Sequence, residues 1–310
     1  MLPPSVDDAI RSIASDRTTG ASKLARVSLE TMMLLVVERQ GKPGREELAA
    51  AARRISEAQP AMASVHNVAE LFSRLLVEGA DPREVQAHLR SELDHAHERI
   101  AGTFLKDAPD RASIMTLSHS EAVLACLRLL DEKGRLDRVY VMESRPLFEG
   151  RVLAETLAEG GIGVTILTDA LGPSQMSRAD LALIGADSVL RDGSVVNKVG
   201  SFSLALAAQT YQKPFYVACE TLKFDARYTK ATWPGSPPRD PSEVWESPRE
   251  GVEIDNRYFE AVPAELVTRV VSERGGYAPD ILRVMLSEGR QTAALGMTRN
   301  SGLEPSSTDP

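Results

Sequence analysis

Three side chains that could do acid–base chemistry lie close together in the middle of the sequence. Asp187 closely follows a short apolar run, and Asn197 and Lys198 come soon after it. Between them, Asp192 and Gly193 are flanked by apolar residues and predict a tight hairpin turn that folds Lys198 back toward Asp187. Because a buried carboxylate costs free energy unless it is paired, we expect an acid, an amide and an ammonium group to converge there. A purely structural ion pair between Asp187 and Lys198 is the alternative.

A second group of polar residues follows an earlier apolar run and opens a helix. Ser118, His119 and Ser120 place hydroxyls and free backbone N–H groups at a helix N-terminus, which is a favourable place for an anion. Simple helix capping by Ser118 or Ser120 is an equal alternative, and the two roles can coexist.

Two further cations follow other apolar runs. Arg145 precedes a proline and could clamp a phosphate or carboxylate, with a surface ion pair to Glu143 or Glu149 as the alternative. Lys223 follows the last of these runs. We expect both side chains at one edge of a sheet, because ligands of open parallel sheets bind beyond the carboxyl ends of the strands.

The elements that must position these residues alternate between strands and helices. Such alternation predicts a doubly wound α/β domain over about residues 107–290, with a parallel sheet covered on both faces. The predicted strands lie at 113–118, 138–143, 163–168, 181–184 and 215–218, and the predicted helices at 120–132, 148–159 and 201–211.

The first part of the chain, residues 1–106, predicts a helical domain without strands. Its apolar residues recur at helical spacing over 22–39, 45–58, 67–78 and about 82–100. The proline-rich segment 230–250 predicts a long loop, which could be a lid or could bind a partner. The polar stretch 291–310 predicts a disordered tail.

Composition excludes several classes of protein. The chain has 310 residues and a formal net charge of −8, which argues against a general nucleic-acid-binding protein. No apolar stretch approaches the length of a membrane span, and the N-terminus lacks the layout of a signal peptide, so we expect a cytoplasmic protein. The usual glycine-rich nucleotide-binding motifs are absent, and no zinc site or Ser–His–Asp arrangement stands out.

The two cysteines and most histidines suggest no chemistry. Cys126 and Cys219 lie in apolar runs and are expected to be small buried hydrophobic residues. His88, His95 and His97 share one acidic helix at a spacing that forms no metal pair, so we expect them to be solvated or lightly packed, and His66 is similar.

Five segments of the chain carry a resemblance to a known family. They are IMTLSHSEAVL (114–124), ESRPLFEGRVLAETLAEGGI (143–162), IGADSVLRDGSVVNKVGS (184–201), YVACETLKFD (216–225) and VPAELVTRVVSERG (262–275). In the same order along the chain, they resemble the superfamily that joins the translation initiation factor 2B alpha, beta and delta subunits to isomerases of methylthioribose 1-phosphate and ribose 1,5-bisphosphate. The resemblance implies a helical N-terminal domain on a Rossmann-like C-terminal domain, with C-terminal domains pairing into homodimers.

The resemblance also assigns residues. Asp187 matches the catalytic aspartate of the isomerases. Ser118 stands where the isomerases have a cysteine, while Thr19 and Gln59 stand at two expected phosphate-binding arginines, although Arg17 is near. A serine hydroxyl cannot replace a tunable thiol as a base unaided. The matched ligand-binding positions are Gly20, Ala21, Ser22 and Lys23 of a phosphate loop, then Arg145, Asn197, Lys198 and Lys223.

Two functional hypotheses follow. In the first, the protein is an aldose–ketose isomerase of a phosphorylated pentose, with Asp187 as acid or base and with Ser118 or His119 in the place of the cysteine. No metal or organic cofactor is expected. In the second, the protein is a non-catalytic regulator that senses a sugar phosphate or a nucleotide, or binds another protein. Under either hypothesis the expected partners are a small phosphorylated sugar or nucleotide and a second copy of the chain, and we expect neither nucleic acid nor a membrane as a partner.

Overall fold

The first part of the chain is helical, as its apolar spacing predicts. The computed structural model describes residues 1–17 and 19–288, so the tail expected at 291–310 lies outside the described residues. Asp81 caps the fifth helix, since its carboxylate accepts hydrogen bonds from the backbone N–H groups of Arg83 and Glu84. The helices are α1 (Pro4–Ser15), α2 (Ala21–Glu38), α3 (Arg45–Ala58), α4 (Ala63–Val77) and α5 (Pro82–Asp107).

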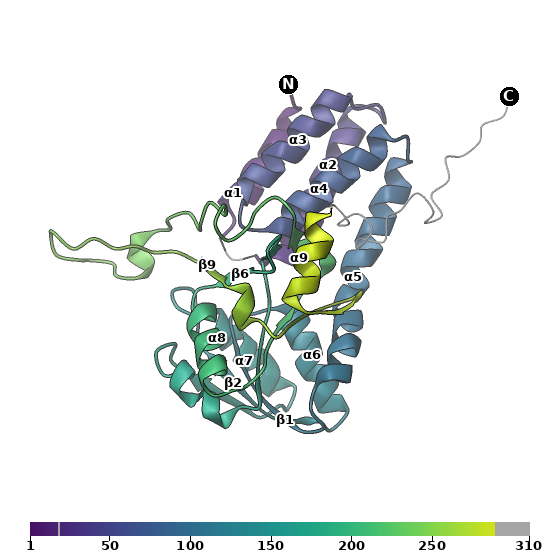
Figure 1. Ribbon diagram of the computed structural model, residues 1–310. Coiled ribbons are helices and arrows are strands. Elements are labelled where there is room, and N and C mark those ends of the chain that lie inside the picture. The colour runs from purple at the N-terminus through teal and green to yellow at the C-terminus, as the bar shows by residue number, and fades with distance from the viewer. Residues whose placement is uncertain (18, 289–310) are drawn as a thin grey trace.

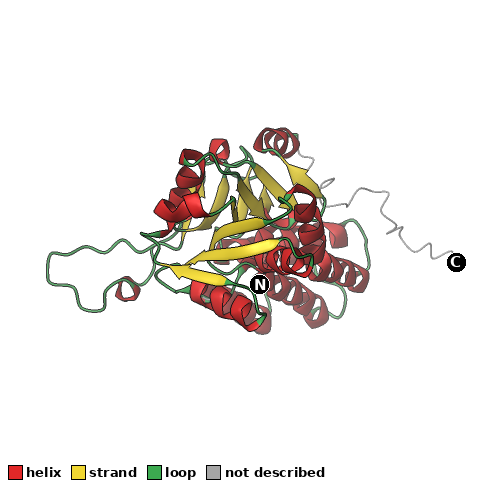
Figure 2. Ribbon diagram, turned by 90° about the horizontal axis from the view of Figure 1, so that it is seen from below, coloured by secondary structure: helices red, strands yellow, loops and turns green. Residues whose placement is uncertain are grey.

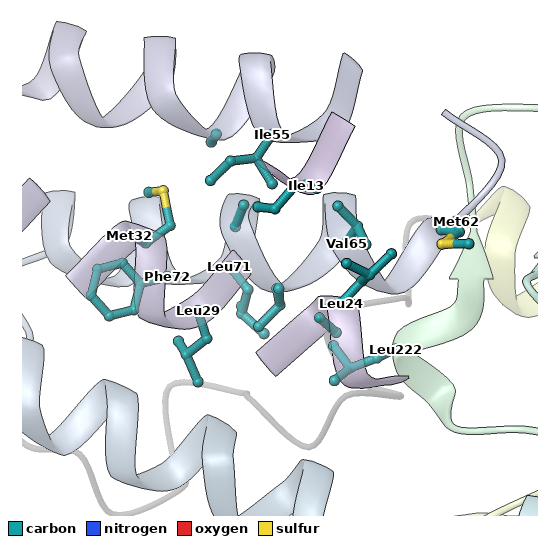
Figure 3. Close-up of a cluster of buried hydrophobic side chains, with 14 of the residues drawn as sticks. Ile13, Leu24, Leu29, Met32, Ile55, Met62, Val65, Leu71, Phe72 and Leu222 are labelled. Carbon is teal, nitrogen blue, oxygen red and sulfur yellow. The ribbon is translucent and has the colours of Figure 1, made fainter. Parts of the chain in front are cut away.

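The helices α1 to α4 pack around an apolar core at one end of the molecule, and α5 runs from them alongside the sheet (Figure 1). Ile13, Leu29, Ile55 and Phe72 come from the four helices and meet in this core (Figure 3). Leu222, from the second half of the chain, enters the same cluster. The helical core is therefore completed by a residue next to a predicted ligand-binding lysine.

The part of the described chain that follows α5 contains a seven-stranded sheet in the order β11-β10-β7-β4-β1-β2-β3. All neighbouring strands are parallel except β10 and β11. The α/β prediction is confirmed, whereas the domain boundary at 106 stays a prediction. The strands are β1 (Ala112–Leu117), β2 (Leu136–Met142), β3 (Val164–Leu167), β4 (Leu181–Ile184), β7 (Phe215–Ala218), β10 (Arg269–Ser272) and β11 (Gly275–Tyr277).

Helices cover this sheet on both faces. Ile114 packs with α5, α6 and α7, whereas its neighbour Met115 packs in the cluster that includes α8 and α9. This alternation follows from the two-residue period of a strand. Figure 2 shows the strands inside and the helices around them. The covering helices that follow β1 are α6 (Glu121–Glu132), α7 (Glu149–Glu159), α8 (Ser201–Thr210) and α9 (Pro279–Ser287).

A second, four-stranded sheet in the order β8-β5-β6-β9 joins the two halves. Its strands are β5 (Ser188–Leu190), β6 (Val195–Lys198), β8 (Phe224–Asp225) and β9 (Phe259–Val262). The predicted hairpin connects β5 to β6, and Gly193 adopts a left-handed φ of 84° in its turn. Leu190 and Val196 face the helical core, whereas Val189 and Val195 face the core of the large sheet. The hairpin is thus a wall shared by both cores.

The proline-rich segment forms a long loop, as predicted. Its regular structure over 230–250 is the short helix η3 (Pro241–Glu243), and the loop extends away from the body of the molecule (Figure 1). Its base is held because the guanidinium of Arg145 donates hydrogen bonds to the carbonyls of Glu243 and Val244, both 3.1 Å away. Among the described residues, no helix is long and apolar enough to cross a bilayer.

We expect Gly150→Ala to destabilise the protein strongly. A Cβ at Gly150 would lie 1.9 Å from the carbonyl oxygen of Met142, where the first turn of α7 meets the end of β2. Relief of this clash requires backbone movement, so the free energy of unfolding, measured with urea, should fall by about 2–4 kcal/mol. The matched control is Gly102→Ala in α5, where the new Cβ has no atom within 4 Å. The control should be neutral or stabilising by up to about 1 kcal/mol, and equal effects of both changes would contradict the close contact.

Candidate functional site

A cavity of about 400 Å³ lies between the helical part and the ends of the strands of the large sheet. The structure brings most of the predicted site residues to its wall. Arg145 does not line the cavity. The predicted residues that do are Gly20, Ala21, Ser22, Lys23, Ser118, His119, Ser120, Asp187, Asn197, Lys198 and Lys223.

The predicted phosphate loop forms the N-terminus of α2. Gly20 is the N-cap residue, and its carbonyl accepts hydrogen bonds from the backbone N–H groups of Lys23 and Leu24. The first N–H groups of a helix have no acceptor within the helix, and the helix dipole adds positive potential there. The Ser22 hydroxyl donates to the buried carboxylate of Glu220, so it is already engaged. The loop therefore offers backbone donors rather than this hydroxyl to an anion.

The turn after β1 places Ser118 and His119 at the cavity. Ser118 has a left-handed φ of 62°, and its backbone N–H donates to the Ser144 hydroxyl at 2.7 Å. Ser120 caps α6 by accepting from the backbone N–H of Val123, so the capping alternative applies to Ser120. The Nε2 of His119 is buried and has no hydrogen-bond partner among the described residues. Among the described residues, this nitrogen therefore has no hydrogen bond that would fix the orientation of the His119 ring.

Asp187 lies at the wall of the cavity, held by backbone contacts on both sides. Its N–H donates to the carbonyl of Val196, and its carbonyl accepts from the N–H of Ala63 at the start of α4. Burial raises the pKa of the Asp187 carboxyl to about 6, although the positive charges of Lys223 and Lys198 oppose that shift. Asp187 can therefore both donate and accept a proton near neutral pH.

The two lysines that act on Asp187 are paired with glutamates. The Nζ of Lys198 lies 2.6 Å from the Oε1 of Glu149, and the Nζ of Lys223 lies 3.0 Å from the Oε2 of Glu220. The alternative of a direct Asp187–Lys198 ion pair is therefore not what the described residues show. Both lysines are buried, so their charges act on a ligand through little water.

Two neighbouring strands bring an amide, an ammonium and two aromatic rings to the cavity. Asn197 and Lys198 lie on β6, and Phe259, directly after Tyr258, begins β9, which pairs with β6. The ammonium of Lys198 lies 4.7 Å from the ring centroid of Tyr258 and 5.5 Å from that of Phe259. Asn197 donates from its Nδ2 to the Ser201 hydroxyl at 2.9 Å, which fixes its amide. Tyr258 and Phe259 also line the cavity, and sequence reasoning missed them because they follow the irregular proline-rich segment.

Glu220 is a buried junction that the sequence did not reveal. It accepts hydrogen bonds from Ser22 and from the Nε2 of His97 (2.7 Å), and it pairs with Lys223. These partners hold the pKa of the Glu220 carboxyl well below its usual range, although burial alone would raise it. The expectation that His97 is solvated or lightly packed is wrong, because α5 passes directly beside this carboxylate. Local spacing on α5 carries no signal for a partner so distant in sequence.

Two other predicted positions have structural roles. Arg145 is exposed, lies 5.0 Å from the ring centroid of Phe148 and pins the proline-rich segment, so it forms neither a clamp at the cavity nor the alternative ion pairs. The Nε2 of Gln59 donates to the carbonyls of Ile13 and Asp16, which ties down the end of α1. Gln59 therefore does not stand in as a ligand group for an arginine.

We expect Asp187→Asn to stabilise the protein above pH 6. The folded pKa of about 6 exceeds that of an unfolded aspartate, so folding favours the protonated carboxyl. This contribution is present below about pH 4 and is lost as the pH rises through 6. The variant should gain roughly 1–3 kcal/mol over the wild type at pH 7.5 and little at pH 4.5, measured by urea unfolding across this range.

The control for this prediction is Asp8→Asn, because Asp8 is an exposed carboxylate on α1. Its stability difference from the wild type should not change between pH 4.5 and 7.5 in the way that the Asp187→Asn difference does. Parallel stability curves for the wild type and Asp187→Asn would contradict a carboxyl that titrates near 6.

The chain is similar to proteins of known name over most of its length. The chain is 27% identical over 290 residues to a ribose 1,5-bisphosphate isomerase of Archaeoglobus fulgidus, covering 91% of this chain and 92% of that protein. It is 33% identical over 288 residues to a translation initiation factor eIF-2B subunit 2-like protein of Pyrococcus furiosus, covering 90% and 98%.

A solved structure shares the fold. The translation initiation factor eIF-2B of Pyrococcus horikoshii superposes with a TM-score of 0.78 at 28% identity, covering 90% of this chain and 98% of that one. Residues 17–279 match the sequence pattern of the Initiation factor 2 subunit family, which confirms the resemblance inferred from the five segments. The chain therefore belongs to the Initiation factor 2 subunit family.

Proposed function

We propose that this protein binds a phosphorylated pentose and interconverts its aldose and ketose forms. The observation that carries the proposal is Asp187, a carboxyl with a pKa of about 6 that lines the cavity beside Lys198 and Lys223. A titratable acid between two buried cations suits a reaction in which a proton moves and negative charge develops on oxygen. Relatives with names of this chemistry include the ribose 1,5-bisphosphate isomerase above and a methylthioribose-1-phosphate isomerase of Pelotomaculum thermopropionicum, 30% identical over 290 residues.

The reaction needs no external oxidant, because substrate and product are isomers. For a ribofuranose 1-phosphate group, the bond between C1 and the ring oxygen breaks and that oxygen takes a proton. The C2 proton leaves, so that an enol forms between C1 and C2. C1 then takes a proton and the C2 hydroxyl loses one, which gives the 2-ketose. One group must therefore act as an acid at the ring oxygen, and another must accept the C2 proton.

The residues of the cavity divide these tasks. Asp187 is the acid and base, since both of its protonation states are populated near neutral pH. His119 takes the place of the missing cysteine as the second proton-transfer group, because its Nε2 has no partner among the described residues. The Ser118 hydroxyl can support a hydrogen bond but cannot act as a base unaided. The lysines and the N-terminus of α2 hold phosphate and developing charge.

We also propose a cytoplasmic homodimer that pairs through the second half of the chain. Support comes from α8, whose outer face leaves Phe202 and Leu206 exposed. Exposed large apolar side chains on one helix face favour contact with another protein surface.

A second candidate function is a non-catalytic sensor that binds the same ligand and reports it through assembly. Ser118 is the observation that favours it, because the serine removes the thiol from the end of β1. Both candidates need the phosphate loop and the lysines, so ligand binding alone does not separate them. A measurement of turnover separates them, because only the isomerase converts the ligand.

The test is to incubate the protein with ribose 1,5-bisphosphate, ribose 1-phosphate or methylthioribose 1-phosphate in deuterium oxide and to follow C2 by NMR. We expect ketose formation or deuterium exchange with one of them. Asp187→Asn should lower turnover by about 10²–10⁴-fold, the usual range for loss of an acid–base group, while the ligand still raises the melting temperature. Asp8→Asn should match the wild type.

Ser118→Cys should raise turnover, because a thiol restores a tunable base at the end of β1. No ketose and no exchange with any of the three sugars, together with a ligand-dependent rise in melting temperature, would overturn the isomerase and leave the sensor. Turnover that survives in Asp187→Asn would remove Asp187 from the chemistry.

A further inference from the structure

Two arginines from distant parts of the sequence lie in the neighbourhood of Tyr258, a residue of the cavity wall. Arg17 lies just before α2 and lines the cavity together with Tyr258. Arg239 belongs to the proline-rich segment, and its guanidinium carbon lies 4.9 Å from the ring centroid of Tyr258. The segment that extends from the molecule therefore contributes a cation beside the predicted site.

Neither guanidinium is neutralised by an ion pair in the part of the chain that the structure describes. Arg17 donates one hydrogen bond, from Nη1 to the carbonyl of Ala14 at 3.3 Å. The Nε of Arg239 is buried and has no acceptor among the described residues. A buried donor without a partner is rare in native proteins and calls for a missing water or ion.

The two charges also act on each other. The pKa of Arg239 is lowered by burial and, next, by the positive charge of Arg17. Glu243 opposes this shift, but its carboxylate already accepts hydrogen bonds from the Tyr258 hydroxyl (2.6 Å) and from the Asn256 amide (2.7 Å). Two nearby cations with unused donors are unfavourable by themselves and favourable around an anion.

The backbone holds Arg239 where it is needed. Its N–H donates to the carbonyl of Asn256 at 2.9 Å, and Asn256 also donates from its side chain to the carbonyl of Asp240. These hydrogen bonds join two parts of the loop, one at Arg239 and Asp240 and the other at Asn256, close to Tyr258. Holding the base of the loop in this way reduces the entropy that would be lost when Arg239 orders around a ligand.

We propose that Arg17 and Arg239 together bind a phosphoryl group of the ligand. The pair supplies the two guanidinium groups that the resemblance expects at Thr19 and Gln59. Thr19 and Gln59 have no guanidinium, and their own donors are already engaged, because the Thr19 hydroxyl donates to Asp16 and the Gln59 amide donates to backbone carbonyls. The proline-rich segment thereby contributes one of the two cations. This inference deepens the proposed function and rests on its phosphorylated ligand.

The test measures binding of inorganic phosphate and of ribose 1,5-bisphosphate by isothermal titration calorimetry at constant ionic strength. Arg17→Gln and Arg239→Gln should each weaken binding of the bisphosphate by about 10–100-fold, the loss expected for a charge-assisted hydrogen bond. Each should also weaken the binding of inorganic phosphate. Adenosine 5′-monophosphate, as a third ligand, tells a nucleotide from a sugar phosphate as the source of the phosphoryl group.

Arg249→Gln is the matched control for Arg239→Gln, because Arg249 is an exposed arginine of the same segment. Arg11→Gln is the control for Arg17→Gln, because Arg11 is an exposed arginine on α1. Both controls should bind as the wild type does. Circular dichroism and the melting temperature without phosphate check that the four variants are folded, and removal of one of two like charges should not destabilise the protein.

The outcomes separate the two proposals. If the wild type binds ribose 1,5-bisphosphate and the Arg17 and Arg239 variants bind it equally well, the arginine subsite is wrong while the proposed function stands. If the wild type binds inorganic phosphate through both arginines but binds and converts no sugar phosphate, the subsite stands and the proposed function falls. If the wild type binds none of these ligands, the subsite is wrong as well.

Discussion

The structure depends on one hairpin that belongs to two cores at once. β5 and β6 send alternate side chains into the helical core and into the core of the large sheet. A shift of register by a single residue would exchange the two faces, so that each core would receive side chains whose size and shape do not fit it. Asp187 precedes this hairpin, and Lys198 ends it. The apolar constraint on the strands therefore also fixes the positions of the polar groups at the cavity.

Electrostatic balance explains how so many charges can lie inside. Lys198 and Lys223 are each paired with a glutamate, and neither draws Asp187 into an ion pair. Glu220 is further held by Ser22 of the phosphate loop and His97 of α5. The removal of one member of such a network leaves another charge buried and unpaired, and this is why the groups depend on one another.

Much of this architecture can be predicted from the sequence, because short apolar runs and turn residues report local structure. The strands of the sheet that the runs predict, the hairpin at Gly193 and the convergence of Asp187, Asn197 and Lys198 follow from such signals. Contacts between residues that are far apart in the sequence cannot be predicted from such local signals. His97 with Glu220 and Arg239 with Tyr258 join segments whose meeting is decided by tertiary packing. The position of Arg145 after a strand predicts a ligand-binding group. Its hydrogen bonds to the proline-rich segment, which is distant in sequence, cannot be predicted from local patterns.

The entry of Leu222 into the helical core has a consequence for how the protein could be divided. The side chain belongs to the sheet half of the chain but is buried beside α2 and α4 (Figure 3), and the next residue is Lys223. Neither half can complete its own apolar interior alone, and neither carries a whole cavity. Docking of the two halves would therefore complete the apolar interior and the cavity at the same time.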